Sequence, residues 1–210
     1  AKHYVLPQSQ QDSLIRAAEA SCFLIAVIET NFGKKLFFFI SGLIVSVPIT
    51  LFVSRLADAF CLLLPLLIAI ICSSSIVAPL VEEFAKAYPF FYRYEVPSKP
   101  LMTLGFLTGL GFGITEFFMY VFVYDAPLLL RIHPIFFHAA SASIVTYGIS
   151  KRSTLKFYSL AVFLHFLNNF FAALGYLWFV GGLGATIAAY FLSYRYFRRS
   201  SDSKLDEKRP

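Results

Sequence analysis

Charged residues are scarce in this chain. Only 14% of its 210 residues are charged, whereas 58% are hydrophobic and 18% are aromatic. An average soluble domain is roughly 25% charged, so this chain has too little polar surface to cover a water-soluble fold. The composition excludes a soluble globular domain and predicts an integral membrane protein.

The sequence also lacks the short motifs of several hydrolase classes. It contains no HExxH pair of zinc-binding histidines and no GxSxG nucleophile turn. Asp58 and Asp125 fall at the ends of apolar stretches, so a pair of catalytic aspartates at membrane depth is not expected. These protease chemistries are therefore disfavoured.

Cysteine is rare as well. Cys22, Cys61 and Cys72 are odd in number, lie among Leu, Ile and Phe, and form no CxxC pair. A disulfide framework or a thiolate metal site normally shows a recognisable spacing. We therefore expect these residues to be small buried hydrophobic side chains.

Long apolar runs dominate the chain, such as Leu36–Val53, Leu101–Val123 and Tyr176–Leu192. Each approaches the roughly 20 residues that cross a bilayer as a helix. The sequence predicts an all-α bundle of about seven transmembrane helices in a single domain, residues 1–199, followed by a polar, disordered tail, residues 200–210. The expected helices cover residues 14–31, 36–54, 64–92, 101–123, 129–150, 156–174 and 176–195.

Two stretches leave the number of spans open. Residues 14–31 contain several charges and would also suit an amphipathic helix in the membrane interface. Residues 57–92 would reach about 54 Å as one helix, against a hydrocarbon core near 30 Å. A break in CSSSIVAP, which ends at Pro79, would make 57–72 an additional short span and give about eight in total.

Basic residues gather on one side of such a bundle. Because basic residues collect in cytoplasmic segments, the C-terminus is predicted to be cytoplasmic. The net charge of +6 is thus ascribed to topology in a lipid bilayer, and no nucleic-acid partner is expected. The side with the C-terminus holds Lys34, Lys35, Arg93, Lys99, Lys151, Arg152, Lys156, Arg195, Arg198 and Arg199, and the other side holds Lys2, Arg16, Arg55 and Arg131.

Six polar residues interrupt apolar stretches, and they are the candidate functional residues. Ionisable groups are costly at bilayer depth and usually face a protein interior or a wet cavity, where they serve function. One such residue could be incidental, but six in four stretches between residues 79 and 169 predict a site. The six are Glu82, Glu83, Glu116, His138, His165 and Asn169, with Lys86 and Arg131 in support.

Helical spacing indicates how the first group is arranged. Glu82 and Glu83 are adjacent and point about 100° apart, so they are not expected to face one partner. Lys86 follows four residues after Glu82 and three after Glu83, within reach of either. The group is either an ion pair at a helix end or a functional pair in which one carboxylate acts as a general base.

The other polar residues share helix faces in pairs. Arg131 and His138 are seven residues apart, and His165 and Asn169 are four apart. Glu116 follows the glycine-rich run GLGFGIT, whose glycines suit close helix packing but do not explain a carboxylate among phenylalanines. A histidine with an amide one turn later suits holding a water or polarising a carbonyl better than binding zinc.

The motifs and their order resemble those of the PrsW family of intramembrane proteases. They are APLVEEFAK, GFGITE, an arginine followed by His138, and HFLNN. More distantly, the chain is similar to the superfamily of CAAX prenyl proteases and bacteriocin-immunity proteins, in which a histidine stands at the position of Glu116. It also resembles, weakly, the Aph-1 subunit of γ-secretase. The resemblance covers about residues 60–175.

The resemblance implies a glutamate-dependent peptidase that cuts membrane-anchored proteins near or within the bilayer, in some cases to release a signalling factor. By this analogy Glu82 activates water, tuned by Glu83 and Lys86. His138, His165 and Asn169 position the water and stabilise the oxyanion. Glu116 orients a histidine or completes the acid–base set. No cofactor is expected, with zinc as the alternative, because glutamates and histidines together can bind it.

Two other functions fit the same polar residues. A scaffold or assembly subunit like Aph-1 would use them to hydrogen-bond helices together, although the intact pair of glutamates favours an enzyme. A transporter would use them as a proton relay, but the inverted repeat of many transporters is not apparent. The small size of the chain favours a prokaryotic cell membrane as its location.

Overall fold

The computed structural model describes residues 32–91, 96–175 and 178–200. Within these residues every regular element is helical and no strand occurs, so the predicted all-α fold is confirmed. The expected helix over 14–31 and residues 201–210 of the expected tail lie outside the described residues.

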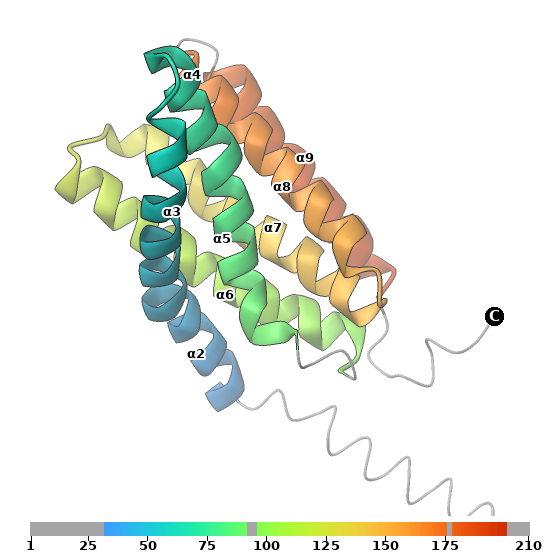
Figure 1. Ribbon diagram of the computed structural model, residues 1–210. Coiled ribbons are helices and arrows are strands. Elements are labelled where there is room, and N and C mark those ends of the chain that lie inside the picture. Colours follow the sequence, from blue (N-terminus) through green and yellow to red (C-terminus); the bar gives the residue numbers. More distant parts are fainter. Residues whose placement is uncertain (1–31, 92–95, 176–177, 201–210) are drawn as a thin grey trace, which may run out of the picture.

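The chain forms long helical rods joined by short connections (Figure 1). Several rods are not α-helical throughout, because π-helical or 3₁₀ segments continue them. In chain order the elements are α2 (Phe32–Ile40), a π-helical segment (Ser41–Ser46), α3 (Val47–Cys61), α4 (Leu66–Ile70), a π-helical segment (Ile71–Val77), α5 (Ala78–Ala87), a 3₁₀ turn (Tyr88–Phe90), α6 (Ser98–Phe118), a π-helical segment (Met119–Val123), α7 (Leu128–Ser150), α8 (Thr154–Ala173) and α9 (Trp178–Arg198).

Four rods in the described part of the chain are long and apolar enough to cross a bilayer. Helices α8 and α9, with 20 and 21 residues, would each extend about 30 Å, which also matches the hydrocarbon core. The four rods are Phe32–Cys61, Leu66–Phe90, Ser98–Val123 and Leu128–Ser150.

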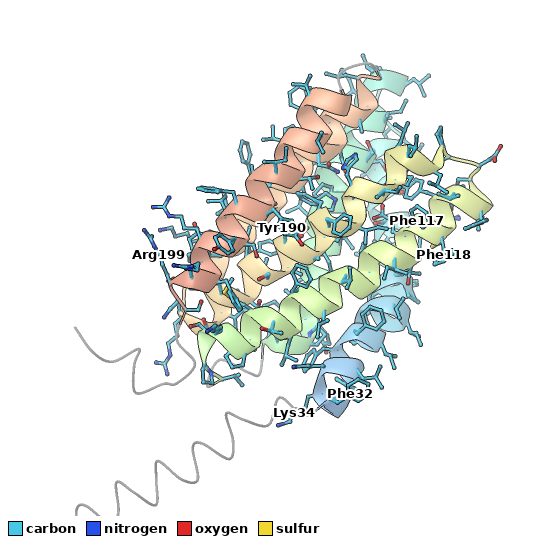
Figure 2. The ribbon with its side chains drawn as sticks, turned by 180° about the vertical axis from the view of Figure 1, so that it is seen from behind. Phe32, Lys34, Phe117, Phe118, Tyr190 and Arg199 are labelled. Carbon is cyan, nitrogen blue, oxygen red and sulfur yellow. A yellow bond between two sulfur atoms is a disulfide. The ribbon has the colours of Figure 1, made fainter. Side chains whose placement is uncertain are left out.

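The surface of the bundle suits a lipid environment. Large apolar side chains, among them Phe118 and Tyr190, are exposed on its flanks, whereas Lys34 and Arg199 are exposed close to the ends of their helices (Figure 2). Exposed apolar surface on this scale is rare in soluble monomers. The distribution is the one expected of helices that contact acyl chains along their length.

The first described rod is longer than the predicted span over 36–54. It continues to Cys61, although Arg55 and Asp58 stand near its end. The carboxylate of Asp58 accepts a hydrogen bond from the hydroxyl of Ser73 on the next rod. A charged residue that finds a partner on a neighbouring helix does not have to end a span.

The break near Pro79, which the sequence left open as an alternative to one helix over 64–92, does not occur. The turn lies earlier, at residues 62–65, and residues 66–90 form one rod. Pro79 is the second residue of α5, directly after the π-helical segment, where the α-helical hydrogen-bond ladder is already interrupted and a missing N–H is tolerated. The alternative of a separate span over 57–72 is therefore wrong.

The expectation that the cysteines are isolated hydrophobic residues is wrong for two of them. Cys61, at the end of α3, forms a disulfide with Cys72, and their Cα atoms are 5.7 Å apart. The turn at residues 62–65 folds the following rod back against α3, which brings the two thiols together. Cys22 lies outside the described residues.

Helix α7 packs against α6, α8 and α9. In its contact with α6, the backbone of α7 lies against glycines of α6 that are spaced four residues apart. A side chain at Gly109 would collide with the carbonyl of His138, and one at Gly113 would collide with the backbone of Ile135. Small residues let helix backbones approach closely in lipid, so this row of glycines holds His138 against α6.

Another face of α6 is covered by α2 and by the π-helical segment that follows it. Thr108 and Thr115 of α6 donate hydrogen bonds to the backbone carbonyls of Phe38 and Leu43. Helix α3 then continues beside α5. As a result, α3, α5 and α6 surround one space inside the bundle, and Glu82 of α5 forms part of its wall.

Candidate active site

Helix α5 carries three ionisable residues that are buried in the bundle. The side chains of Glu83 and Lys86 have 0% exposure, and Glu82 is also buried. Nζ of Lys86 lies 2.7 Å from Oε1 of Glu83. Helical spacing allowed Lys86 to pair with either glutamate, and the structure pairs it with Glu83. Such burial does not fit an ion pair at an exposed helix end.

Oε1 of Glu83 accepts hydrogen bonds from three helices. It lies 2.7 Å from Nζ of Lys86, 3.0 Å from Oγ of Ser141 on α7, and 2.9 Å from Nδ1 of His165 on α8. Lys86 also donates to Oγ of Ser141, at 3.1 Å. Charge-assisted hydrogen bonds are stronger than neutral ones, so Glu83 fixes α5, α7 and α8 relative to one another.

The partners of His138 define its protonated nitrogen. Nδ1 lies 3.0 Å from Nζ of Lys86, and a lysine ammonium donates hydrogen bonds but cannot accept them. Nδ1 therefore accepts, and we assign the ring hydrogen to Nε2. Nε2 is 2.5 Å from Oε2 of Glu116, so the nitrogen that carries the hydrogen lies against this carboxylate.

The second histidine has the opposite tautomer. Nδ1 of His165 faces Oε1 of Glu83, which can only accept from it. Nε2 is then unprotonated and lies 3.5 Å from Oε2 of Glu82. One imidazole thus spans both glutamates. The expectation that Glu82 and Glu83 cannot face one partner is wrong, because the two nitrogens of a ring lie on different edges.

Oε2 of Glu82 is one of three unpaired carboxylate oxygens in the described part of the cluster, together with Oε2 of Glu83 and Oε2 of Glu116. Oε2 of Glu82 lies 3.5 Å from the unprotonated nitrogen of His165. It is buried and has no hydrogen-bond partner among the described residues. Buried polar atoms are nearly always paired with protein or water, so this oxygen is expected to bind a water or a substrate group. A water beside Oε2 of Glu82 and Nε2 of His165 would find an acceptor for each of its two hydrogens.

A cavity of about 240 Å³ opens onto Glu82 and Glu116 between α3, α5 and α6. The two carboxylates form part of its wall, and apolar and aromatic side chains form most of the rest. A single water needs only about 10–15 Å³ of such space, so the cavity can hold a larger group. Its wall consists of Val47, Thr50, Leu51, Glu82, Phe112, Glu116, Met119, Tyr120 and Tyr124.

Aromatic rings enclose the two histidines. The ring centroid of Phe112 is 4.9 Å from that of His138, and the centroid of Phe137 is 5.0 Å from that of His165. The two imidazoles contact each other at 5.1 Å, edge to face. Apolar rings exclude water, and charges interact more strongly where water is excluded.

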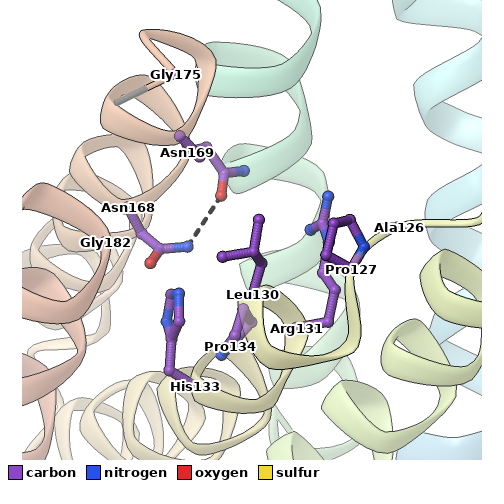
Figure 3. A pocket seen from close by; sticks show the side chains of 11 residues that line it. Ala126, Pro127, Leu130, Arg131, His133, Pro134, Asn168, Asn169, Gly175 and Gly182 are labelled. Atoms are coloured by element: carbon purple, nitrogen blue, oxygen red, sulfur yellow. Dashed lines mark hydrogen bonds between the residues drawn. The ribbon is translucent and has the colours of Figure 1, made fainter. Parts of the chain in front are cut away.

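Asn169 lies one turn beyond His165 and ties α8 to the π-helical segment before α5. Its Nδ2 donates to the backbone carbonyl of Ser74 at 2.8 Å, and its Oδ1 accepts from Nδ2 of Asn168 at 3.1 Å. Figure 3 shows Asn168 and Asn169 in the wall of a second cavity, whose volume is also about 240 Å³. The hydrogen bond from Asn169 to the carbonyl of Ser74 helps to hold α8, and with it His165, in place.

Arg131 lines the same second cavity. Its guanidinium stacks on the ring of Tyr120, 3.6 Å from the centroid, and Tyr120 belongs to the wall of the first cavity. The structure thus gathers Glu82, Glu83, Lys86, Glu116, His138 and His165 into one cluster, and it places Arg131 and Asn169 at the adjoining cavity.

The cluster contains a donor set that fits a metal ion. Glu82, His138 and His165 are buried, and each offers one ligand atom within 4.8 Å of the others. Two histidines and a glutamate form a common ligand set of catalytic zinc. Oε2 of Glu82 and Nε2 of His165 face a shared space, whereas His138 would have to turn its Nε2 from Glu116 toward the ion.

Two residues near the carboxylates were not predicted from the sequence. Ser141 follows His138 by three residues and so shares its helix face, a spacing that could have revealed it. Thr50 is a threonine in an apolar run outside residues 60–175, and nothing in the sequence distinguishes it from a threonine that bonds within its own helix.

A helical membrane bundle with buried carboxylates and histidines defines a candidate intramembrane hydrolase. Residues 32–196 match the family of PrsW intramembrane metalloproteases. The chain therefore belongs to this family, and it is an integral membrane protein of a peptidase family. Searches of curated proteins and of solved structures found no match.

Proposed function

We propose that the chain is a glutamate-dependent endopeptidase that cleaves membrane-anchored proteins. Its family is one of intramembrane proteases, and the buried cluster supplies a candidate base. The observation that carries the proposal is Oε2 of Glu82, which has no hydrogen-bond partner among the described residues and faces the basic nitrogen of His165 beside a cavity.

In this mechanism a water binds between Glu82 and His165. Glu82 takes a proton from the water as the oxygen attacks the scissile carbonyl carbon, which forms a tetrahedral intermediate. Glu82 then delivers the proton to the leaving nitrogen, and the C–N bond breaks. The products are a carboxylic acid and an amine, and Glu82 is again a carboxylate at the end of the cycle.

The remaining residues of the cluster hold these groups in position. Glu83 accepts from Nδ1 of His165 and so keeps its Nε2 unprotonated. Lys86 donates to Nδ1 of His138 and so keeps the ring hydrogen of His138 on Nε2. This Nε2–H would stabilise the developing oxyanion once it turns from Glu116. Removing one oxyanion donor typically costs about 10²–10³ in kcat. Asn169 positions His165 through its bond to the π-helical segment.

Zinc is the second candidate for activating the water, favoured by the donor set of Glu82, His138 and His165. A zinc ion bound there would lower the pKa of its water to about 7 and polarise the carbonyl. Removal of metal by a chelator would then abolish cleavage, and added zinc would restore it. The glutamate mechanism predicts that cleavage survives the chelator.

The proposed location is a prokaryotic cell membrane with the C-terminus in the cytoplasm. In this orientation the turn at residues 62–65 lies on the outer side, and so does the disulfide between Cys61 and Cys72. Disulfides persist in oxidising compartments and are rare in the cytosol. The disulfide therefore supports the orientation that the basic residues predict.

The test compares purified wild-type protein with Glu82→Gln in liposomes. Each sample is incubated with solubilised membrane proteins, and new N-termini are sequenced. We expect new termini with wild type and none with Glu82→Gln. Asp125→Asn is the matched control, because Asp125 is exposed in the α6–α7 connection and asparagine tolerates its positive φ of 54°; this variant should cleave normally.

The competing function is a scaffold like Aph-1, in which the cluster only joins helices. In that case no sample produces new termini, and Glu82→Gln lowers thermal stability or the recovery of partner proteins. Cleavage by a folded Glu82→Gln protein at the wild-type rate would refute the role of Glu82.

A further inference from the structure

The hydroxyl of Thr50 is buried and has no hydrogen-bond partner among the described residues. A threonine in a membrane helix usually satisfies its hydroxyl by donating to a backbone carbonyl about one turn earlier. Other threonines of this chain do so, namely Thr103, Thr108, Thr115, Thr146 and Thr186. Thr50 does not, although it lies within a helix.

Thr50 faces the same space as the carboxylates. It stands on α3 in the wall of the cavity that also exposes Glu82 and Glu116. A buried hydroxyl without a partner costs free energy that a folded protein normally avoids. Thr50 therefore combines an unpaired buried hydroxyl with a place in the same cavity wall as the proposed base.

The cavity has the properties required to bind a peptide. Its volume of about 240 Å³ far exceeds the space of about 10–15 Å³ that one water needs. Val47, Leu51 and Met119 supply apolar walls, which suit the side chains of a membrane-embedded substrate. Leu51 and Tyr124 of this wall are themselves exposed on the outside of the bundle, so the cavity borders the surface that a membrane-embedded substrate would contact.

A peptide must leave its helix before its bond can be attacked, and its carbonyls then lose their partners. In the bilayer interior an unpaired backbone carbonyl is strongly unfavourable, because no water is there to pair with it, so a site for an extended peptide needs hydrogen-bond donors in its wall. Glutamate side chains that are ionised only accept. Thr50 offers a hydroxyl donor that no described residue uses.

We propose that the cavity between α3, α5 and α6 binds the scissile segment of the substrate in an extended form, and that the hydroxyl of Thr50 donates to one of its backbone carbonyls. This inference rests on the proposed peptidase function. It adds a substrate-positioning residue on α3, a helix that carries none of the six polar motif residues.

The test uses Thr50→Val, which replaces the hydroxyl with a methyl group of similar shape. The probe is a synthetic peptide that spans the bond identified by N-terminal sequencing, reconstituted with the enzyme in liposomes. We expect KM to rise about tenfold, the effect of one lost hydrogen bond to a buried carbonyl, with kcat within about twofold of wild type. Thr50→Ser keeps the hydroxyl and should restore KM.

Two further measurements separate positioning from structure. Because the hydroxyl of Thr50 bonds to no described residue, Thr50→Val should leave the thermal midpoint unchanged or raise it. Ser54→Ala is the matched control, since Ser54 also has a buried hydroxyl without a described partner but does not line the cavity. Its kinetics should equal those of wild type.

The possible failures are distinguishable. Unchanged KM in Thr50→Val, beside an inactive Glu82→Gln, would overturn the inference and leave the peptidase function standing. A parallel loss of stability and activity in Thr50→Val would assign Thr50 a structural role and also overturn it. Absence of cleavage by wild type would overturn the peptidase function and, with it, this inference.

Discussion

Removal of the buried ammonium of Lys86 should destabilise the bundle strongly. Lys86→Met keeps the length and apolar character of the side chain but leaves the carboxylate of Glu83 without its cation. Both side chains have 0% exposure, and the N–O distance is 2.7 Å. Breaking a buried ion pair by removing one partner typically costs about 3–5 kcal/mol, because the remaining charge stays buried. We expect the free energy of unfolding of Lys86→Met to fall by about that amount.

The double variant Glu83→Gln/Lys86→Met tests the cause of this loss. With both charges removed, no uncompensated charge remains, and the glutamine oxygen can still accept from Ser141 and His165. The double variant should therefore lose less stability than the sum of the two single variants. A coupling free energy of about 0.5–3 kcal/mol is typical of residues in direct contact.

The assay is reversible unfolding in mixed detergent micelles, followed by circular dichroism. Lys156→Met is the matched control, because Lys156 is exposed on α8; it should change the free energy of unfolding by less than about 0.5 kcal/mol. The reasoning is refuted if Lys86→Met is as stable as Lys156→Met, since the ammonium would then contribute nothing to the cluster.

Two further predictions concern helix packing and the disulfide. Gly109→Ala should lower stability by about 1–3 kcal/mol, because its methyl group would meet the carbonyl of His138; Gly33→Ala, where a methyl group meets nothing within 4 Å, should not. Cys61→Ser removes the disulfide, which joins residues 11 positions apart. The free energy of unfolding should therefore fall by about 3 kcal/mol. The substitution should also make Cys72 reactive to alkylation, measured by intact mass, and an unreactive Cys72 would contradict the disulfide.

The sequence was sufficient to predict the fold class and the membership of the polar cluster in outline. Apolar runs about as long as a bilayer is thick require helices, because every backbone group must be satisfied within the segment. The cost of ionisable groups in such runs then singled out Glu82, Glu83, Glu116, His138 and His165 as candidates. The lengths of the rods were less predictable, since Asp58 remains in a helix through its bond to Ser73.

The partners of these residues could not be predicted. Helical spacing placed Lys86 within reach of both glutamates, and only the packing of α7 against α5 decided for Glu83, where Ser141 adds a further donor. His165 also contacts both Glu82 and Glu83 in this packing. The sequence argued against a shared partner, because adjacent residues of a helix point about 100° apart.

What the sequence by itself determined is therefore local: which segments become helices and which side chains are too polar for lipid. What only the tertiary structure decided is relational: the disulfide between Cys61 and Cys72, the tautomers of both histidines, and the meeting of Thr50 with Glu82 and Glu116 at one cavity. The physical reason is that the period of a helix fixes directions only within that helix. The rotation and distance between helices depend on interhelical contacts, such as that of Gly109 with the backbone of α7, which no single segment specifies.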